Sequence, residues 1–142
     1  MKRIVAIALF LAASFLTTRT AMAQSYVVEV NVPFSFNVNS ITLPAGHYSI
    51  ATDLDQPAVL TFRDRAKGIV AMNLAMSDPS GSGKPGTLLF NHYGGQYFLS
   101  EIRSETASMN LYLPPSKAEK RAKWQTQVAG LPVSSDVIVT IY

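Results

Sequence analysis

The sequence predicts an all-β protein, an antiparallel meander of about eight short strands with one short helix before the last strand. Three observations predict it: apolar residues at alternate positions, clusters of turn residues between these stretches, and a Gly94-Gly95 pair between two alternating segments. The pattern leaves open whether the strands close as a small barrel or fold as a sandwich.

The chain begins with a segment typical of a cleavable secretory signal peptide, over residues 1–23. Residues 1–3 are basic, residues 4–16 form an apolar run, and Ala21-Met22-Ala23 is a small-x-small cleavage site. A transmembrane helix needs about 20 apolar residues, so this run is too short. We expect cleavage between Ala23 and Gln24, a secreted or periplasmic protein without a transmembrane segment, and a single β domain over 24–142.

The charge and cysteine content exclude several classes of function. The formal net charge of +3 counts Lys2, Arg3 and Arg19, and without them nine basic residues face nine acidic ones. A neutral mature chain does not favour nucleic acid as a partner. The absence of cysteine excludes disulfides, a thiol nucleophile and thiolate metal sites.

The first expected strand runs from Tyr26 to Val38, where apolar residues occupy every second position. Pro33 cannot donate a ladder hydrogen bond, so we expect a bent or bulged edge strand. Asn39-Ser40 and residues 43–46 supply turn chemistry. The second strand then carries its inward residues at Tyr48, Ile50 and Leu54.

Asp55-Gln56-Pro57 leads into a third strand, with Leu60 and Phe62 inward, and the polar run 64–68 closes a hairpin. In the fourth strand the larger apolar residues and the small ones alternate. The larger ones are Val70, Met72, Leu74 and Met76, and the small ones between them include Ala71 and Ala75. Residues 77–86 are rich in Gly, Pro and Ser and predict a loop.

Gly94-Gly95 predicts a two-residue hairpin between segments 87–93 and 96–103. The resulting register places Phe90 opposite Leu99 and His92 opposite Tyr97. A seventh strand then passes through Met109, Leu111 and Leu113.

Pro114-Pro115 ends that strand, and Ser116 with Glu119 fits a capping box for a helix to about Gln125. We expect Trp124 to pack on the sheet. The helix cations, Lys117, Lys120, Arg121 and Lys123, are interpreted as a solvated face, the alternative being contact with anionic lipid, lipopolysaccharide or an acidic partner. Residues 137–142 form a last β-branched strand that closes or extends the sheet.

Several blocks of this chain resemble a family of small secreted bacterial β-proteins without an assigned function. They are residues 32–36 (VPFSF), 43–48 (LPAGHY), 97–102 (YFLSEI) and 113–120 (LPPSKAEK), so the resemblance spans most of residues 26–123. This chain departs from the family pattern at Arg103, where an aromatic often stands, and near Asn39-Ser40, where a glycine is common. The resemblance implies an exported β-protein and no catalytic residues.

Few residues are candidates for chemistry. His47 and His92 are the two groups that could act as bases at neutral pH, but no motif brings either to a nucleophile and a carboxylate. Asp53 and Asp55 flank a turn without the spacing of a calcium loop. Gly81-Ser82-Gly83-Lys84 lacks the other residues of a phosphate loop. We therefore expect no catalytic, cofactor-binding or metal-binding residue.

The expected function is that of an exported, non-catalytic β-domain that binds something or acts in the cell envelope. Its partner would be a protein, an envelope component or a small apolar ligand. One alternative is a barrel that holds an apolar ligand in a cavity of about 300 Å³ or more. The other is a secreted hydrolase that uses His47 or His92.

Overall fold

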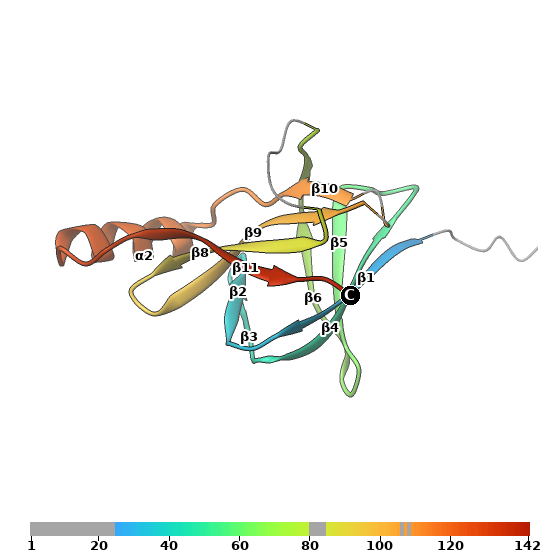
Figure 1. The fold of residues 1–142 in the computed structure, drawn as a ribbon, viewed down its shortest axis with the longest axis horizontal. Helices are drawn as coiled ribbons and strands as arrows, with labels where there is room; N and C mark the ends of the chain where they lie inside the picture. Colours follow the sequence, from blue (N-terminus) through green and yellow to red (C-terminus); the bar gives the residue numbers. More distant parts are fainter. Residues whose placement is uncertain (1–24, 80–84, 106, 108) are drawn as a thin grey trace, which may run out of the picture.

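The computed structural model describes residues 25–79, 85–105, 107 and 109–142, and most of them lie in β-strands. The all-β class and the single short helix before the last strand are confirmed (Figure 1). The described elements are β1 (Ser25–Val32), β2 (Phe36–Val38), β3 (Ile41–Leu43), β4 (Gly46–Asp53), β5 (Val59–Asp64), β6 (Gly68–Leu74), β7 (Met76–Ser77), β8 (Thr87–Tyr93), β9 (Gln96–Ser104), β10 (Met109–Tyr112), α2 (Lys117–Val128) and β11 (Ser134–Thr140). The expected signal peptide lies outside the described residues.

Hydrogen bonding divides the strands into two connected sheets. One has the order β1-β4-β5-β6, and the other has the order β11-β8-β9-β10-β7, with β2 parallel to β9 and β3 paired to β2. The sheets meet where Val30 bridges to Ile141 and where the chain passes from β6 through Ala75 into β7. The strands therefore curl around one core as a half-barrel, and β11 helps to close it as predicted (Figure 1).

The prediction of one continuous strand from Tyr26 to Val38 is wrong. The chain forms β1 up to Val32, breaks at Pro33, and resumes as β2 in the other sheet. Proline has no N–H for the ladder, so the break occurs where pairing with β4 would otherwise continue. The inward parity nevertheless survives the break, and its buried members are Val28, Val30, Val32, Phe36 and Val38.

The break allows Phe36 to join the two sheets. Its ring lies edge-on to Tyr48 of β4, with centroids 5.4 Å apart, and edge-on to Phe90 of β8 at 5.5 Å. All three side chains are buried. Edge-to-face pairs contribute about 0.5–1.5 kcal/mol each beyond the area that they bury. The short strand β2 therefore provides the aromatic contact that joins the two sheets.

The hairpin at Gly94-Gly95 is confirmed in detail. Phe90 pairs with Leu99 and His92 pairs with Tyr97, as the two-residue loop predicts. Both glycines have positive φ, at 55° and 85°, which a type I′ turn requires. Local turn chemistry therefore sets the register of β8 against β9.

From Met72 in β6 to Met76 in β7, the chain turns its larger side chains outward. Met72, Leu74 and Met76 are 58%, 66% and 60% exposed, whereas the small residues of the other parity, Ala71 and Ala75, are buried. The register explains this choice, because Ala71 lies opposite Phe62, whose buried ring fills the interior beside it. Leu54 is also exposed, against expectation, because β4 ends at Asp53.

Arg103, at which the chain departs from the resembling family, is buried in β9. Its guanidinium donates from Nε and Nη2 to Glu101 Oε2 and lies 3.6 Å from Asp78 Oδ2. A buried cation requires such partners, because an unpaired charge would be costly away from water. The pair with Asp78 holds the segment after β7 against β9.

Tyr48 combines deep burial with a specific hydrogen bond. Its side chain is 1% exposed, and its hydroxyl donates to the carbonyl of Pro44 at 2.7 Å. Burial, and to a lesser extent the charge of Asp64, raises the pKa of this hydroxyl above its usual value. The folded state therefore favours the neutral phenol. The stabilisation that the neutral Tyr48 phenol provides is complete below a pH of about 10 and is lost as the pH rises through the raised pKa.

We expect Tyr48→Phe to lower the free energy of unfolding by about 1 kcal/mol at neutral pH, because it removes one hydrogen bond. Above pH of about 10 the deficit should shrink, since only the parent chain must keep the Tyr48 phenol neutral. Urea unfolding across this pH range measures both effects. Tyr26→Phe, on an exposed side chain, is the control. A deficit that grows with pH would contradict the account.

Candidate functional site

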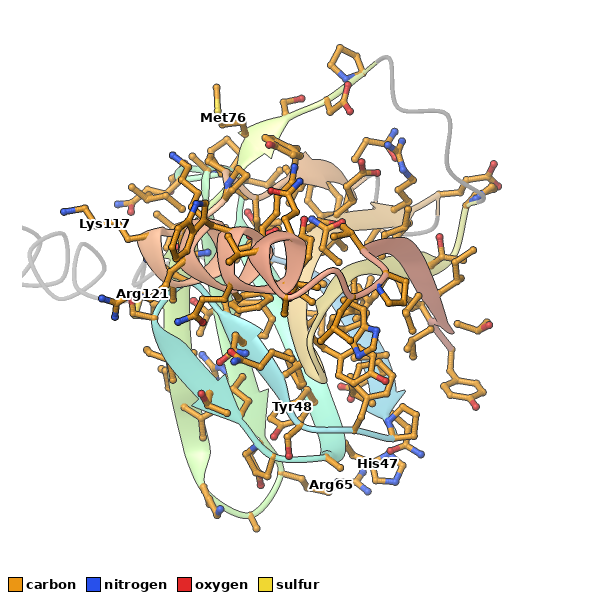
Figure 2. All side chains as sticks on the ribbon, turned by 90° about the vertical axis from the view of Figure 1, so that its left-hand side faces the viewer. His47, Tyr48, Arg65, Met76, Lys117 and Arg121 are labelled. Atoms are coloured by element: carbon orange, nitrogen blue, oxygen red, sulfur yellow. The ribbon has the colours of Figure 1, made fainter. Side chains whose placement is uncertain are left out.

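His47 lies on the outer face of β4, exposed to solvent. It lines an open hollow of about 720 Å³ together with Ser49, Glu29, Asp64 and Arg65. Figure 2 shows His47 and Arg65 at the same end of the molecule. Among the described residues no hydrogen bond links His47 to Ser49 or Asp64. Asp64 Oδ1 instead accepts the backbone N–H groups of the β5–β6 turn, at 2.8 and 3.3 Å. The residues of a hydrolytic triad share this hollow but are not aligned as one.

His92 packs within the β8–β9 hairpin. Its ring stacks on Tyr97 with centroids 4.4 Å apart, and Tyr97 stacks on Phe34 at 4.0 Å. His92 belongs to β8 and His47 to β4, which lie in different sheets. The fold therefore does not bring the two candidate bases together.

The turn considered for calcium has a structural role, and the loop considered for phosphate lies outside the described residues. Asp53 Oδ1 accepts the N–H of Asp55 at 3.1 Å, as in an ordinary Asx turn. No group of three or more metal-ligating side chains occurs among the residues described. Residues 80–84, which include Gly81-Ser82-Gly83-Lys84, lie outside the described residues.

Side chains fill the interior of the half-barrel. Its largest buried side chains include Tyr48, Phe36, Phe62, Phe90, Leu60 and Leu88. A hollow of about 390 Å³ opens instead at one end, between Tyr26, Pro57 and Met109. We call this space the end hollow. It is large enough for a small ligand but opens at the surface.

A third hollow follows the outer strand of the first sheet. It has a volume of about 480 Å³, and its apolar wall consists of Val59, Met72, Leu74, Pro114 and Pro115. Its polar residues are Asn39, Asn73 and Ser116. We call it the β6 groove. It joins a strand, a turn and a proline pair that are distant in sequence.

The strand beside this groove has an open edge. Among the described strands, β6 is the last of its sheet and pairs with β5 alone. The chain then continues into β7, which pairs with β10 of the other sheet. An edge strand presents N–H and C=O groups on which another chain can pair, and of these the Leu74 N–H already donates to Asn73 Oδ1 at 2.9 Å. Exposed Met72 and Leu74 stand next to that edge. The groove thus combines an open strand edge with an apolar wall. In the sequence, the one indication of this surface is the alternation of large and small apolar residues along β6.

Helix α2 is anchored to the outside of the second sheet. Ala122 packs with Tyr93 and Phe98, and the carboxylate of Glu119, 5% exposed, accepts a hydrogen bond from Asn91 at 2.8 Å. Burial raises the pKa of the Tyr93 hydroxyl, with smaller contributions from Glu119 and Tyr112. These contacts hold the helix on β8 and β9.

The helix cap is only half as predicted. Ser116 Oγ accepts the N–H of Glu119 at 3.1 Å, but the Glu119 carboxylate turns to Asn91 in place of completing the capping box. The helix continues to Val128, beyond Gln125. The expectation that Trp124 packs on the sheet is wrong. Trp124 is 63% exposed, because Glu119, Ala122 and Thr126 occupy the buried face.

No helix among the described residues is long and apolar enough to cross a membrane. No protein-family model, curated protein or solved structure matches this chain. The described geometry is therefore the basis for the functional argument.

We expect Asn91→Ala to lower the free energy of unfolding by about 1.5–3 kcal/mol, because it leaves the buried Glu119 carboxylate without this donor. Amide hydrogen exchange in α2 should also become faster, because the helix loses an anchor. Urea unfolding and residue-resolved exchange measure the two effects. Asn110→Ala, at an exposed position of β10, is the matched control. Equal losses in both variants would show that the Asn91–Glu119 contact does not anchor α2.

Proposed function

We propose that residues 24–142 form an exported, non-catalytic binding domain of the cell envelope, which captures an extended polypeptide segment in the β6 groove. The observation that carries this proposal is the open edge of β6 beside the apolar wall of Met72, Leu74 and Pro114-Pro115. The export signal expected in residues 1–23 supports the location.

The chemistry of the groove favours an extended apolar partner. A segment added to β6 would satisfy the backbone groups of the open edge, as in β-strand addition. Every second side chain of that segment would then face one side, where the apolar wall can receive it. Methionine side chains are flexible and polarisable, so Met72 can adapt to different apolar side chains.

Two other functions have weaker support. A hydrolase would need His47 or His92 aligned with a nucleophile and a carboxylate. His47 shares its hollow with Ser49 and Asp64, but Asp64 Oδ1 accepts backbone N–H groups of the β5–β6 turn, and His92 is stacked on Tyr97. A small apolar ligand would have to enter the end hollow, because side chains fill the interior. The end hollow is therefore the second candidate site.

Selection from a library of random linear peptides tests the β6 groove. We expect binders with apolar residues at alternate positions, which shift the backbone amide signals of β6, Asn39 and Ser116. Leu74→Lys should weaken their binding about tenfold or more, because it places a charge in the apolar wall. Leu54→Lys adds the same charge to an exposed leucine outside the groove and should have little effect.

Two outcomes would contradict this function. In one, the selection would yield no binder; in the other, the binders would shift the amide signals of Met109 and Leu111 at the end hollow and leave those of β6 unchanged. The second outcome would move the peptide site from the β6 groove to the end hollow.

A further inference from the structure

The outer face of α2 concentrates positive charge at one end of the molecule (Figure 1). The helix carries four of the nine basic residues of the mature chain and one of its nine acidic residues. That acidic residue, Glu119, is buried and hydrogen-bonded to Asn91. The helix therefore has a net charge of +3 and the rest of the mature chain −3, although the whole is neutral.

The helix period places the cations around the single tryptophan. Lys117, Arg121, Trp124 and Val128 follow one another at spacings of four and three residues and share the face opposite Ala122. Lys120 lies one turn before Trp124 on the same side. Figure 2 shows Lys117 and Arg121 directed away from the sheets. All five of these outer residues are exposed.

More exposed apolar side chains lie where the helix ends. Val128 is 66% exposed, and Leu131 and Val133 follow in the turn after it, also exposed. Tryptophan prefers the boundary between water and lipid, and lysine and arginine can keep their charges in the headgroup layer above it. The cations of α2 surround Trp124 on the same face, so contact with a membrane surface would depend mainly on charge, with Trp124 and Val128 as the apolar anchors.

We propose that the outer face of α2 binds the surface of an anionic phospholipid bilayer. The helix face is convex and projects at an end of the molecule, which suits a flat partner, and its charge complements anionic headgroups (Figure 1). Lys120 and Arg121 meet the lipid phosphates, and Trp124 enters the headgroup boundary. This contact is independent of the β6 groove and would hold the domain at the membrane.

The single tryptophan reports directly on this contact. The described fold lies within residues 25–142, so the experiment uses the chain that begins at Gln24. Vesicles of equal parts phosphatidylcholine and phosphatidylglycerol should shift the emission of Trp124 to shorter wavelength and sediment with the protein. Vesicles of phosphatidylcholine alone should do neither. High salt should release the protein, because it screens exposed charges.

Variants assign the contact to α2. Each cation removed should lower the partition coefficient about fivefold, so Lys120→Glu with Arg121→Glu should lower it more than tenfold. Arg65→Glu with Lys67→Glu makes the same change of net charge in the β5–β6 turn and should leave binding nearly unchanged. Trp124→Ala should weaken sedimentation severalfold. Unchanged thermal unfolding confirms that each variant is folded.

Two results would overturn the proposal. In the first, Trp124 emission and sedimentation would not respond to the phosphatidylglycerol vesicles; a shift of the emission by polyglutamate would then indicate an acidic protein partner. In the second, the two pairs of charge reversals would weaken binding equally.

Discussion

The fold depends on the contact of Phe36 with Tyr48 and Phe90, because these three rings lie on three strands from two sheets. Phe36 reaches this position only because the chain breaks at Pro33 and lays β2 along β9. The interior is then filled by side chains. The two surfaces that we propose for binding consequently lie outside the core, at an open strand edge and on a helix face.

Local chemistry explains what the sequence could predict. Gly94-Gly95 determines the turn and thereby the pairing of β8 with β9, and Ser116 caps α2 as its position indicates. Alternation also identifies the buried residues of β1 and β5. These features depend on neighbours in the chain, which a single sequence contains.

The features that the sequence left open or predicted wrongly depend on distant partners. The sequence left open which parity of β6 faces inward, and the outward turn of Met72 and Leu74 follows from Phe62 on the neighbouring strand, which leaves room for alanine only. Trp124 faces solvent because Asn91 takes Glu119 toward the sheet and thereby sets the rotation of the helix. No local motif marks the β6 groove, because it joins segments that are far apart in sequence.

Residue-resolved native-state hydrogen exchange tests the central claim, which is that the edge of β6 is open while the core beside it is close-packed. The account predicts that amides of β4 and β9, which pair on both sides, exchange only through global unfolding. Amides that point from β6 toward its open edge, except the Leu74 N–H that donates to Asn73 Oδ1, should exchange orders of magnitude faster, while those bonded to β5 remain protected. Equal protection of all β6 amides would mean that the edge is covered, and would contradict the account.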